Sequence, residues 1–233
     1  MKKIILFTVV LLTGINSTVL FAQAFKRNNF ILNGGVGIGV GYGYRNFTAA
    51  NLNHASGDLY DIDLNYSAGV LFPVSAEYAI SNKFGIGGSF QHGSYINTNA
   101  NKSTANSFGL FGAFHFARKE KLELYTRLSL GLSFLNYVEN NTDYIYYSST
   151  YNNITSTDGS FQYALKGGYV KPSFGMRLYF TEHIGFFADA GFGIYSLKTS
   201  QVETNTGTYD LPGRPMHLVM INFELTTGLA VKF

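Results

Sequence analysis

The sequence has no cysteine and no tryptophan, and only 13% of its residues are charged. The lack of cysteine excludes a disulfide framework, a thiol nucleophile and a lipid-anchored N-terminal cysteine. Soluble domains contain about 25% charged residues, so this chain has few groups to cover a surface that faces water. After residue 24 it also lacks any continuous apolar run of the roughly 20 residues that a membrane-spanning helix needs. A chain that is apolar on average but never for long indicates strands that alternate between lipid and a polar lumen.

Residues 1–24 are predicted to be a secretory signal peptide. Two lysines precede an apolar run, and the segment ends in Ala22-Gln23-Ala24, which is an A-x-A cleavage site. We expect cleavage after Ala24, with a neighbouring bond as the main alternative. Loss of the two lysines leaves 15 basic residues (17 − 2) against 14 acidic ones, so the exported chain is nearly neutral and no nucleic-acid partner is predicted. Residues 25–233 then form one predicted domain.

The clearest pattern lies in the last segment of the chain. Every second residue from Val219 to Phe233 is apolar apart from Thr227, and polar residues such as Asn222 and Glu224 lie between them. A period of two over this length indicates a β-strand with one apolar and one polar face. The same alternation recurs upstream, and it predicts strands at 30–47, 65–80, 84–96, 106–117, 122–134, 161–180, 184–194 and 219–233.

The predicted connections alternate strictly between short and long. The short turns are 81–83, 118–121 and 181–183, and the longer polar loops are 48–64, 97–105, 138–160 and 198–216. Short turns on one side and long loops on the other are typical of transmembrane β-barrels. An even number of strands lets the first and the last pair, which removes exposed edges. The predicted fold is therefore all-β, an eight-stranded antiparallel up-and-down transmembrane barrel with both termini on the short-turn side.

Charge supports the assignment of the two faces. The charged residues assigned to the inner face are Arg45, Glu77, Glu123, Arg127, Lys171, Arg177, Asp189, Glu224 and Lys232, and Lys166 is the one assigned to the outer face. A charge facing lipid costs about 2 to 4 kcal/mol at the membrane midplane, so this distribution is the one a membrane requires. Eight strands leave an interior that side chains can fill, which predicts a lumen charge network acting as a plug. A polar path for small solutes is the alternative.

Two prolines complicate the strand assignments. Pro73 and Pro172 each remove a hydrogen bond from a ladder that has no free edge, so a β-bulge at either is expected. At Pro172 a bulge would turn Lys166 inward and Tyr169 outward.

Several other patterns have simpler interpretations than the sites they suggest. The glycines Gly35, Gly37, Gly39, Gly41 and Gly43 have a spacing of two, which is not that of a nucleotide-binding turn, and we interpret them as thinning a narrow lumen. Asp58, Asp61 and Asp63 lack the glycine and distal glutamate of a calcium loop and indicate a solvated loop. No cofactor or metal site is predicted. Tyr144, Tyr146, Tyr147 and Tyr151, among small polar residues, indicate an aromatic girdle with a flexible loop, or alternatively a surface that binds a partner.

His92 and Ser94 share the predicted outer face of strand 84–96, and their spacing is similar to the His-x-Ser of outer-membrane lipid A deacylases. Such an enzyme needs a carboxylate to orient its histidine, and the next predicted strand supplies none. We therefore expect a protein that is not an enzyme, with a lipid A-modifying barrel as the least favoured alternative.

Four features of the sequence together resemble a known family. They are the leader, the glycine-rich first strand, the three short turns against four long loops, and the ending Leu229-Ala230-Val231-Lys232-Phe233. The chain after residue 24 resembles the outer-membrane β-barrel domain proteins of the OmpX and OmpA-transmembrane-domain type, the porin family abundant in Bacteroidetes. That resemblance implies a location in the bacterial outer membrane, contact with its lipid and lipopolysaccharide, and recognition of Phe233 as a C-terminal signal by the assembly machinery. It implies a structural or surface-interaction role through loops 48–64, 138–160 and 198–216, or passive conduction of small solutes.

Overall fold

In a computed structural model, the described residues are 25–47, 65–97, 102–119, 121–140, 160–199, 201–205, 207–210 and 216–233. They form one antiparallel sheet of ten strands. The strands are β1 (Phe30–Phe47), β2 (Asn65–Ala79), β3 (Phe84–Asn97), β4 (Lys102–Arg118), β5 (Leu122–Asn140), β6 (Ser160–Tyr179), β7 (Ile184–Thr199), β8 (Gln201–Thr204), β9 (Gly207–Asp210) and β10 (Met216–Lys232). Within these residues no helix is long and apolar enough to cross a membrane.

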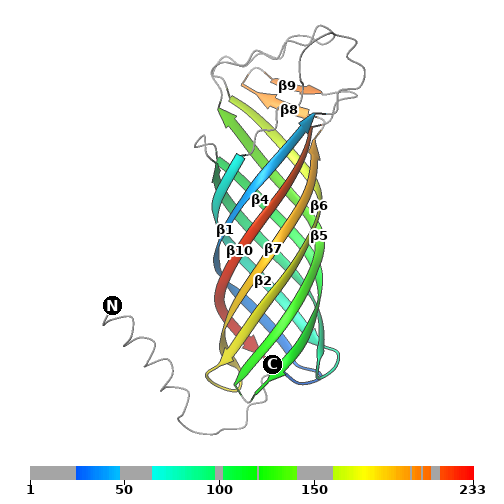
Figure 1. The fold of residues 1–233 in the computed structure, drawn as a ribbon, viewed down its shortest axis with the longest axis vertical. Coiled ribbons are helices and arrows are strands. Elements are labelled where there is room, and N and C mark those ends of the chain that lie inside the picture. The colour runs from blue at the N-terminus through cyan, green and yellow to red at the C-terminus, as the bar shows by residue number, and fades with distance from the viewer. Residues whose placement is uncertain are drawn as a thin grey trace, which may run out of the picture.

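Eight of the ten strands close into a barrel (Figure 1). Each long strand pairs with its neighbours in the chain, β10 pairs with both β1 and β7, and the β5–β6 pairing completes the circle. The remaining strands, β8 and β9, form a hairpin that extends from β6 at the end of the barrel opposite to the short turns. The predicted eight-stranded up-and-down barrel is confirmed.

The three short turns lie at one end, which we call the turn end, and the opposite end is the loop end (Figure 1). Two of the turns use a hydroxyl in the same way. Ser81 Oγ accepts a hydrogen bond from the backbone N–H of Phe84 at 3.0 Å, and Thr181 Oγ1 accepts one from Ile184 at 2.9 Å. These hydrogen bonds stabilise two of the turns that the short polar segments of the sequence predicted.

Several strands reach further toward the loop end than predicted. Strand β4 begins at Lys102, β5 continues to Asn140 and β7 continues to Thr199, so the predicted loops 97–105, 138–160 and 198–216 are too long. The loop predicted at 198–216 also contains the hairpin β8–β9. Loop 48–64 lies outside the described residues, as do Asp58, Asp61, Asp63 and the four loop tyrosines from Tyr144 to Tyr151.

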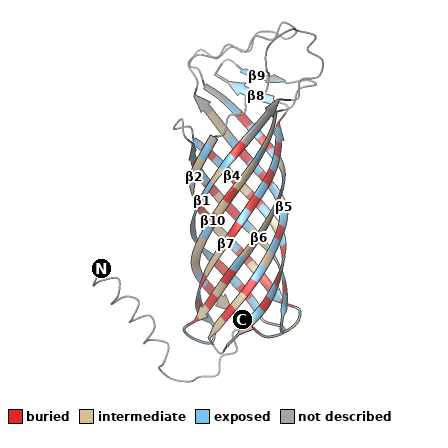
Figure 2. Cartoon of the chain, in the orientation of Figure 1, coloured by how far each residue is buried: buried red, intermediate tan, exposed pale blue. Residues whose placement is uncertain are grey.

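Exposure alternates along each barrel strand (Figure 2). The outward positions carry large apolar side chains, among them Leu110 at 75% exposed, Leu132 at 59% and Leu229 at 59%. The inward positions include buried charged residues such as Glu77 and Arg177, both at 0%. A water-soluble barrel would show the opposite arrangement, so the wall is built to face lipid.

The bulges predicted at the two prolines are wrong. Pro73 and Pro172 interrupt the ladder toward one neighbouring strand, but the pairing resumes in the same register beyond each of them. The side-chain alternation therefore continues, with Lys166 exposed and Tyr169 buried. A register shift does occur on β4, between His115 and Ala117, close to a turn. Rims of barrels are common places for bulges.

Glycines on the inner wall make room for tyrosine rings. A Cβ added at Gly175 would lie 2.6 Å from Cε2 of Tyr125, and one added at Gly193 would lie 2.5 Å from Cε2 of Tyr195. Both distances are far below van der Waals contact, so a larger residue would force the ring to move. The β1 glycines at every second position from Gly35 to Gly43, which we expected to thin the lumen, also lie on the inner face.

Candidate functional site

Four charged side chains from four strands meet inside the turn end of the barrel. Arg177 on β6 donates to Glu77 on β2 through Nη2 at 2.5 Å, and to Glu123 on β5 through Nη1 at 2.8 Å. Its Nε donates to Asn33 Oδ1 at 3.2 Å. The side chains of Arg177, Glu77 and Glu123 are all completely buried. An isolated buried charge would be costly, and here each one is paired and hydrogen-bonded.

His115 on β4 is the fourth member of this turn-end network. Its Nε2 lies 2.7 Å from Glu77 Oε1, and its Nδ1 makes an ion pair with Glu123 Oε1. His115 Nε2 has hydrogen-bond geometry to Glu77, whereas Nδ1 lies beside Glu123 without it. A positive charge on the ring would be attracted to both carboxylates. The network then holds two positive and two negative groups and is neutral as a whole.

Aromatic rings enclose the turn-end network. Phe25 stacks on the His115 ring with centroids 3.5 Å apart and an interplanar angle of 13°, and it is 2% exposed. Tyr125 is close to both cations, with its ring centroid 5.7 Å from that of His115 and 4.5 Å from the Arg177 guanidinium carbon. Residues before β1 also bind the β2–β3 turn, since the backbone N–H of Arg27 donates to Asn82 Oδ1 at 2.9 Å. The start of the described chain thus covers this end of the lumen.

A second polar network lies deeper in the lumen, toward the loop end. Lys171 on β6 donates to Glu224 on β10 at 3.0 Å and to Gln91 on β3 at 2.8 Å. Gln91 donates to Glu224 at 3.1 Å, and the hydroxyl of Tyr195 donates to the other oxygen of Glu224 at 2.8 Å. Arg127 and Asp189 form a wider ion pair at 3.9 Å. We call Lys171, Gln91, Glu224 and Tyr195 the mid-lumen network. Its members lie on β6, β3, β10 and β7, so it links four strands across the barrel.

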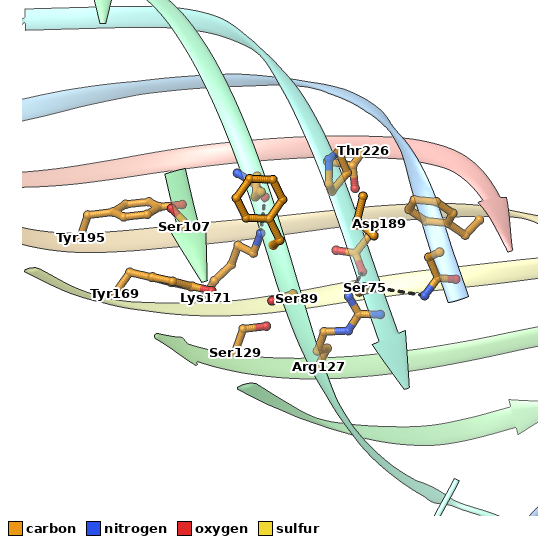
Figure 3. Close-up of a pocket in the computed structure, with 16 residues that line it drawn as sticks. Ser75, Ser89, Ser107, Arg127, Ser129, Tyr169, Lys171, Asp189, Tyr195 and Thr226 are labelled. Carbon is orange, nitrogen blue, oxygen red and sulfur yellow. Dashed lines mark hydrogen bonds and ion pairs between the residues drawn. The ribbon is translucent and has the colours of Figure 1, made fainter. Parts of the chain in front are cut away.

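A cavity of about 40 Å³ lies among these residues (Figure 3). Its lining includes Ser75, Ser89, Ser107 and Ser129, together with the side chains of Arg127, Lys171 and Asp189. That volume holds on the order of one water molecule, each of which occupies about 30 Å³ in the liquid. Polar and apolar groups share its lining about equally, and it is far too small for a sugar or an amino acid.

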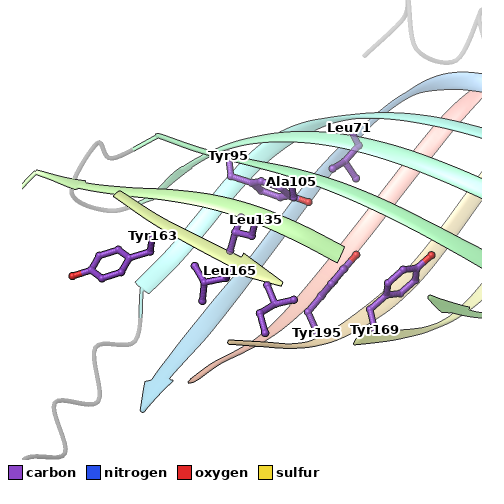
Figure 4. Close-up of a cluster of buried hydrophobic side chains, with 9 residues drawn as sticks. Leu71, Tyr95, Ala105, Leu135, Tyr163, Leu165, Tyr169 and Tyr195 are labelled. Carbon is purple, nitrogen blue, oxygen red and sulfur yellow. The ribbon is translucent and has the colours of Figure 1, made fainter. Parts of the chain in front are cut away.

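The lumen becomes apolar toward the loop end (Figure 4). Leucines and tyrosines from β2, β3, β5, β6 and β7 pack together there with Ala105 of β4. The buried members of this loop-end cluster are Leu71, Tyr95, Ala105, Leu135, Tyr163, Leu165, Tyr169, Tyr195 and Leu197. Tyr169 and Tyr195 stack with centroids 5.4 Å apart, above the mid-lumen network. The lumen is therefore filled by three layers, of which the two nearer the turn end are polar.

The structure places eight of the nine charged residues predicted for the lumen on the inner wall. Glu77, Glu123 and Arg177 join the turn-end network, and Lys171 with Glu224 joins the mid-lumen network, next to the Arg127–Asp189 pair. Lys232 is buried with its Nζ 4.6 Å from the centroid of Tyr179. The ninth, Arg45, belongs to β1, but its side chain lies outside the described part of the chain.

The sequence interpretation missed His115, Asn33 and Gln91, which connect the charged groups. The count of inward charges considered only Asp, Glu, Lys and Arg, so a histidine and two amides were left out. His115 has a signal that could have been used, because it has the same strand parity as the inward Phe111 and Ala113. Among the described residues, no group of three or more His, Asp or Glu side chains is arranged to hold a metal ion.

His92 lies on the outer wall with a different environment. Its Nδ1 is 2.9 Å from Asn106 Oδ1, and its ring stacks on Phe72 with centroids 6.3 Å apart. An amide therefore occupies the place where the deacylase interpretation needs a carboxylate. Ser94 is exposed on the same face.

No protein-family model matches this sequence, and no curated protein matches it. Among solved structures, the outer membrane protein OprG from Pseudomonas aeruginosa aligns with a TM-score of 0.56 and 10% sequence identity, over 90% of this chain and 98% of that one. Neisserial surface protein A aligns with a TM-score of 0.48 and 14% identity, over 88% and 97%. The outer membrane protease OmpT from Escherichia coli aligns with a TM-score of 0.47 and 11% identity, over 93% and 99%. At such identities the likeness concerns the fold, and the chain is a closed eight-stranded antiparallel β-barrel of the kind found in OprG.

Proposed function

We propose that this protein is an integral β-barrel of the bacterial outer membrane that is not an enzyme, and that it strengthens the envelope and presents its loops to the outside. We also assign it to the OmpX-like and OmpA-like porin family type of Bacteroidetes, exported with cleavage of residues 1–24. The apolar outer wall and the likeness to OprG support the location. The leader and the ending in Phe233 support export and assembly.

The turn-end network carries the structural part of this proposal. Arg177, Glu77 and Glu123 have no exposed side-chain surface, and Tyr125 and Tyr179 beside them are at 0% and 1%. The complete burial of these side chains supports a plug at this level of the lumen. A plugged barrel suits a role in holding the envelope and displaying loops better than a role in transport.

Conductance in planar bilayers tests the plug. We expect the purified protein to give no discrete current steps, because an ion would have to separate the buried Arg177–Glu77 and Arg177–Glu123 pairs to pass. The control is a variant with Glu77→Ala, Glu123→Ala and Arg177→Ala together, which empties this layer and should give steps if it folds. Steps from the wild-type protein that persist after the segment 141–159 is shortened would contradict the plug.

A narrow passive channel is the second candidate, and the mid-lumen cavity is the observation that favours it. Its serines, Arg127 and Lys171 form a hydrophilic surface in the middle of the bore. Its volume of about 40 Å³ restricts this function to water or a small ion.

The enzymatic alternative concerns His92. A histidine oriented by the Asn106 amide lacks the negative charge that stabilises an imidazolium during general-base catalysis. We expect lipid A from cells with and without the protein to have the same acyl chains in mass spectra. An acyl-chain difference that disappears with His92→Ala would contradict the proposal.

The proposed partners follow from the surfaces of the barrel. The outer wall contacts membrane lipid and lipopolysaccharide, and the segments 48–64, 141–159 and 200–215 between the barrel strands are the candidates for a surface partner. The C-terminal strand is the candidate for recognition by the assembly machinery. Phe233 is 63% exposed, and its backbone N–H donates to the Phe30 carbonyl at 2.8 Å, so its ring faces outward where the barrel closes.

A further inference from the structure

Three basic side chains form a row across three adjacent strands of the outer wall. Lys166 on β6 is directly opposite Lys198 on β7, and Lys198 is directly opposite His217 on β10. Both lysines are exposed and His217 is half-buried. Neighbouring strands lie about 4.8 Å apart, so the row spans roughly 10 Å. We call these residues the basic row.

The basic row lies directly above the apolar part of the wall. Going from the turn end toward the loop end, the large apolar outward residues finish with Val170 on β6 and Ile194 on β7. From Phe180 to Lys166 is 14 residues (180 − 166), which at about 3.3 Å per residue and a strand tilt of roughly 40° is about 35 Å along the barrel axis. The hydrocarbon core of a membrane is about 30 Å thick. The row thus lies at the level of the lipid headgroups on the loop side.

The charges of the basic row are not balanced within the described part of the chain. Like charges directly opposite each other on neighbouring strands destabilise a sheet. No described carboxylate lies within 4.0 Å of the Lys166 or Lys198 ammonium group. Lys171, which lies in the lumen five residues after Lys166, is instead paired with Glu224. An anion from outside the protein would remove the repulsion between the two outer lysines.

We propose that the basic row binds the phosphate of a phosphorylated lipid in the leaflet on the loop side, a proposal that rests on the membrane location given above. Phosphate oxygens accept charge-assisted hydrogen bonds from ammonium groups, and one phosphate can reach two lysines on adjacent strands. The apolar wall below the row contacts the acyl chains of the same molecule, through Val170, Ile194 and Val219. Free phosphate makes no such contact, so the occupant is a lipid.

Native mass spectrometry of the protein purified from outer membranes into a mild detergent tests this proposal. The protein is incubated with lipid A, with lipid A from which the phosphates have been removed, or with inorganic phosphate. The variants are K166Q/K198Q and the matched control K102Q, which removes an exposed outward lysine at the loop end of β4. We expect the wild type and K102Q to retain lipid A, and K166Q/K198Q to bind it at least tenfold more weakly. The phosphate-free lipid should bind the wild-type protein no more tightly than it binds K166Q/K198Q.

Three results would overturn the basic row as a lipid site. They are binding of lipid A to K166Q/K198Q within twofold of wild type, equal retention of the phosphate-free lipid, and displacement of lipid A by millimolar inorganic phosphate. Folding of each variant is checked by its heat-dependent mobility in gels, and flotation with vesicles checks membrane integration. Integration without lipid A retention would reject the basic row and leave the outer-membrane barrel in place.

Discussion

Replacing Arg177 by methionine should lower the free energy of unfolding by about 3 to 5 kcal/mol, because removal of one partner leaves buried charge without compensation. Glu77 and Glu123 would keep the contact with His115 but lose the guanidinium that they share, and both side chains are completely buried. The measurement is a guanidinium titration of the protein folded in lipid vesicles, followed by circular dichroism of the strand signal.

The control for this variant removes the charges together. Arg177→Met combined with Glu77→Gln and Glu123→Gln leaves no buried carboxylate, and His115 can then be a neutral imidazole, so the variant should recover most of the lost stability. If the single variant does not fold at all, folding of the triple variant still supports the explanation. A loss of less than about 1 kcal/mol for the single variant would show that the pairing contributes little.

Replacing Leu128 by arginine should cost about 2 to 4 kcal/mol, since the side chain would place a charge in the hydrocarbon near the membrane midplane. Leu128 is 51% exposed on the outer wall, in the middle of the outward apolar series of β5 that runs from Leu122 to Phe134. The same titration in vesicles measures the loss.

Asn136 provides the matched position on the same strand and face. It lies just past the apolar series, so Asn136→Arg should cost only about 0 to 1 kcal/mol. Equal effects at Leu128 and Asn136 would contradict a wall that faces lipid. A larger effect at Asn136 would place the apolar band elsewhere on the barrel.

The fold could be predicted because alternation and link length are local properties of the sequence. A strand such as β10 shows its faces through Leu225, Leu229 and the residues between them, without reference to any partner. The extensions at the loop end were missed because alternation weakens there. At the start of β4, Ser103 and Ala105 are inward and Lys102 is outward, which reads as a polar loop.

The bulge position could not be predicted from the same signals. Pro172 leaves part of its ladder unpaired toward β7, yet the strand keeps its register because its other edge pairs continuously with β5. The shift instead follows His115, where no residue type marks it. Register depends on how a turn joins two strands, which parity within one strand does not reveal.

The lumen residues could be predicted as a set but not as pairs. Parity assigned Glu77, Arg177 and Glu224 to the inner face, whereas their partners depend on the stagger between strands far apart in the chain. Arg177 and Glu77 are 100 residues apart, and Gln91 and Glu224 are 133 apart. The same limit hid the covering role of Phe25, which lies before the first strand.

The seam between β1 and β10 has a consequence for the order of events during biogenesis. Ile31 pairs with Lys232, so the two sides of this seam are 201 residues apart (232 − 31). Contacts this distant in sequence form slowly, since a long segment must be immobilised before they compensate for its lost entropy. Until β1 and β10 pair, the edges of both strands and the apolar outer wall are exposed and can aggregate. We therefore expect this seam to close late in folding, after the hairpins between strands that are neighbours in the chain have formed.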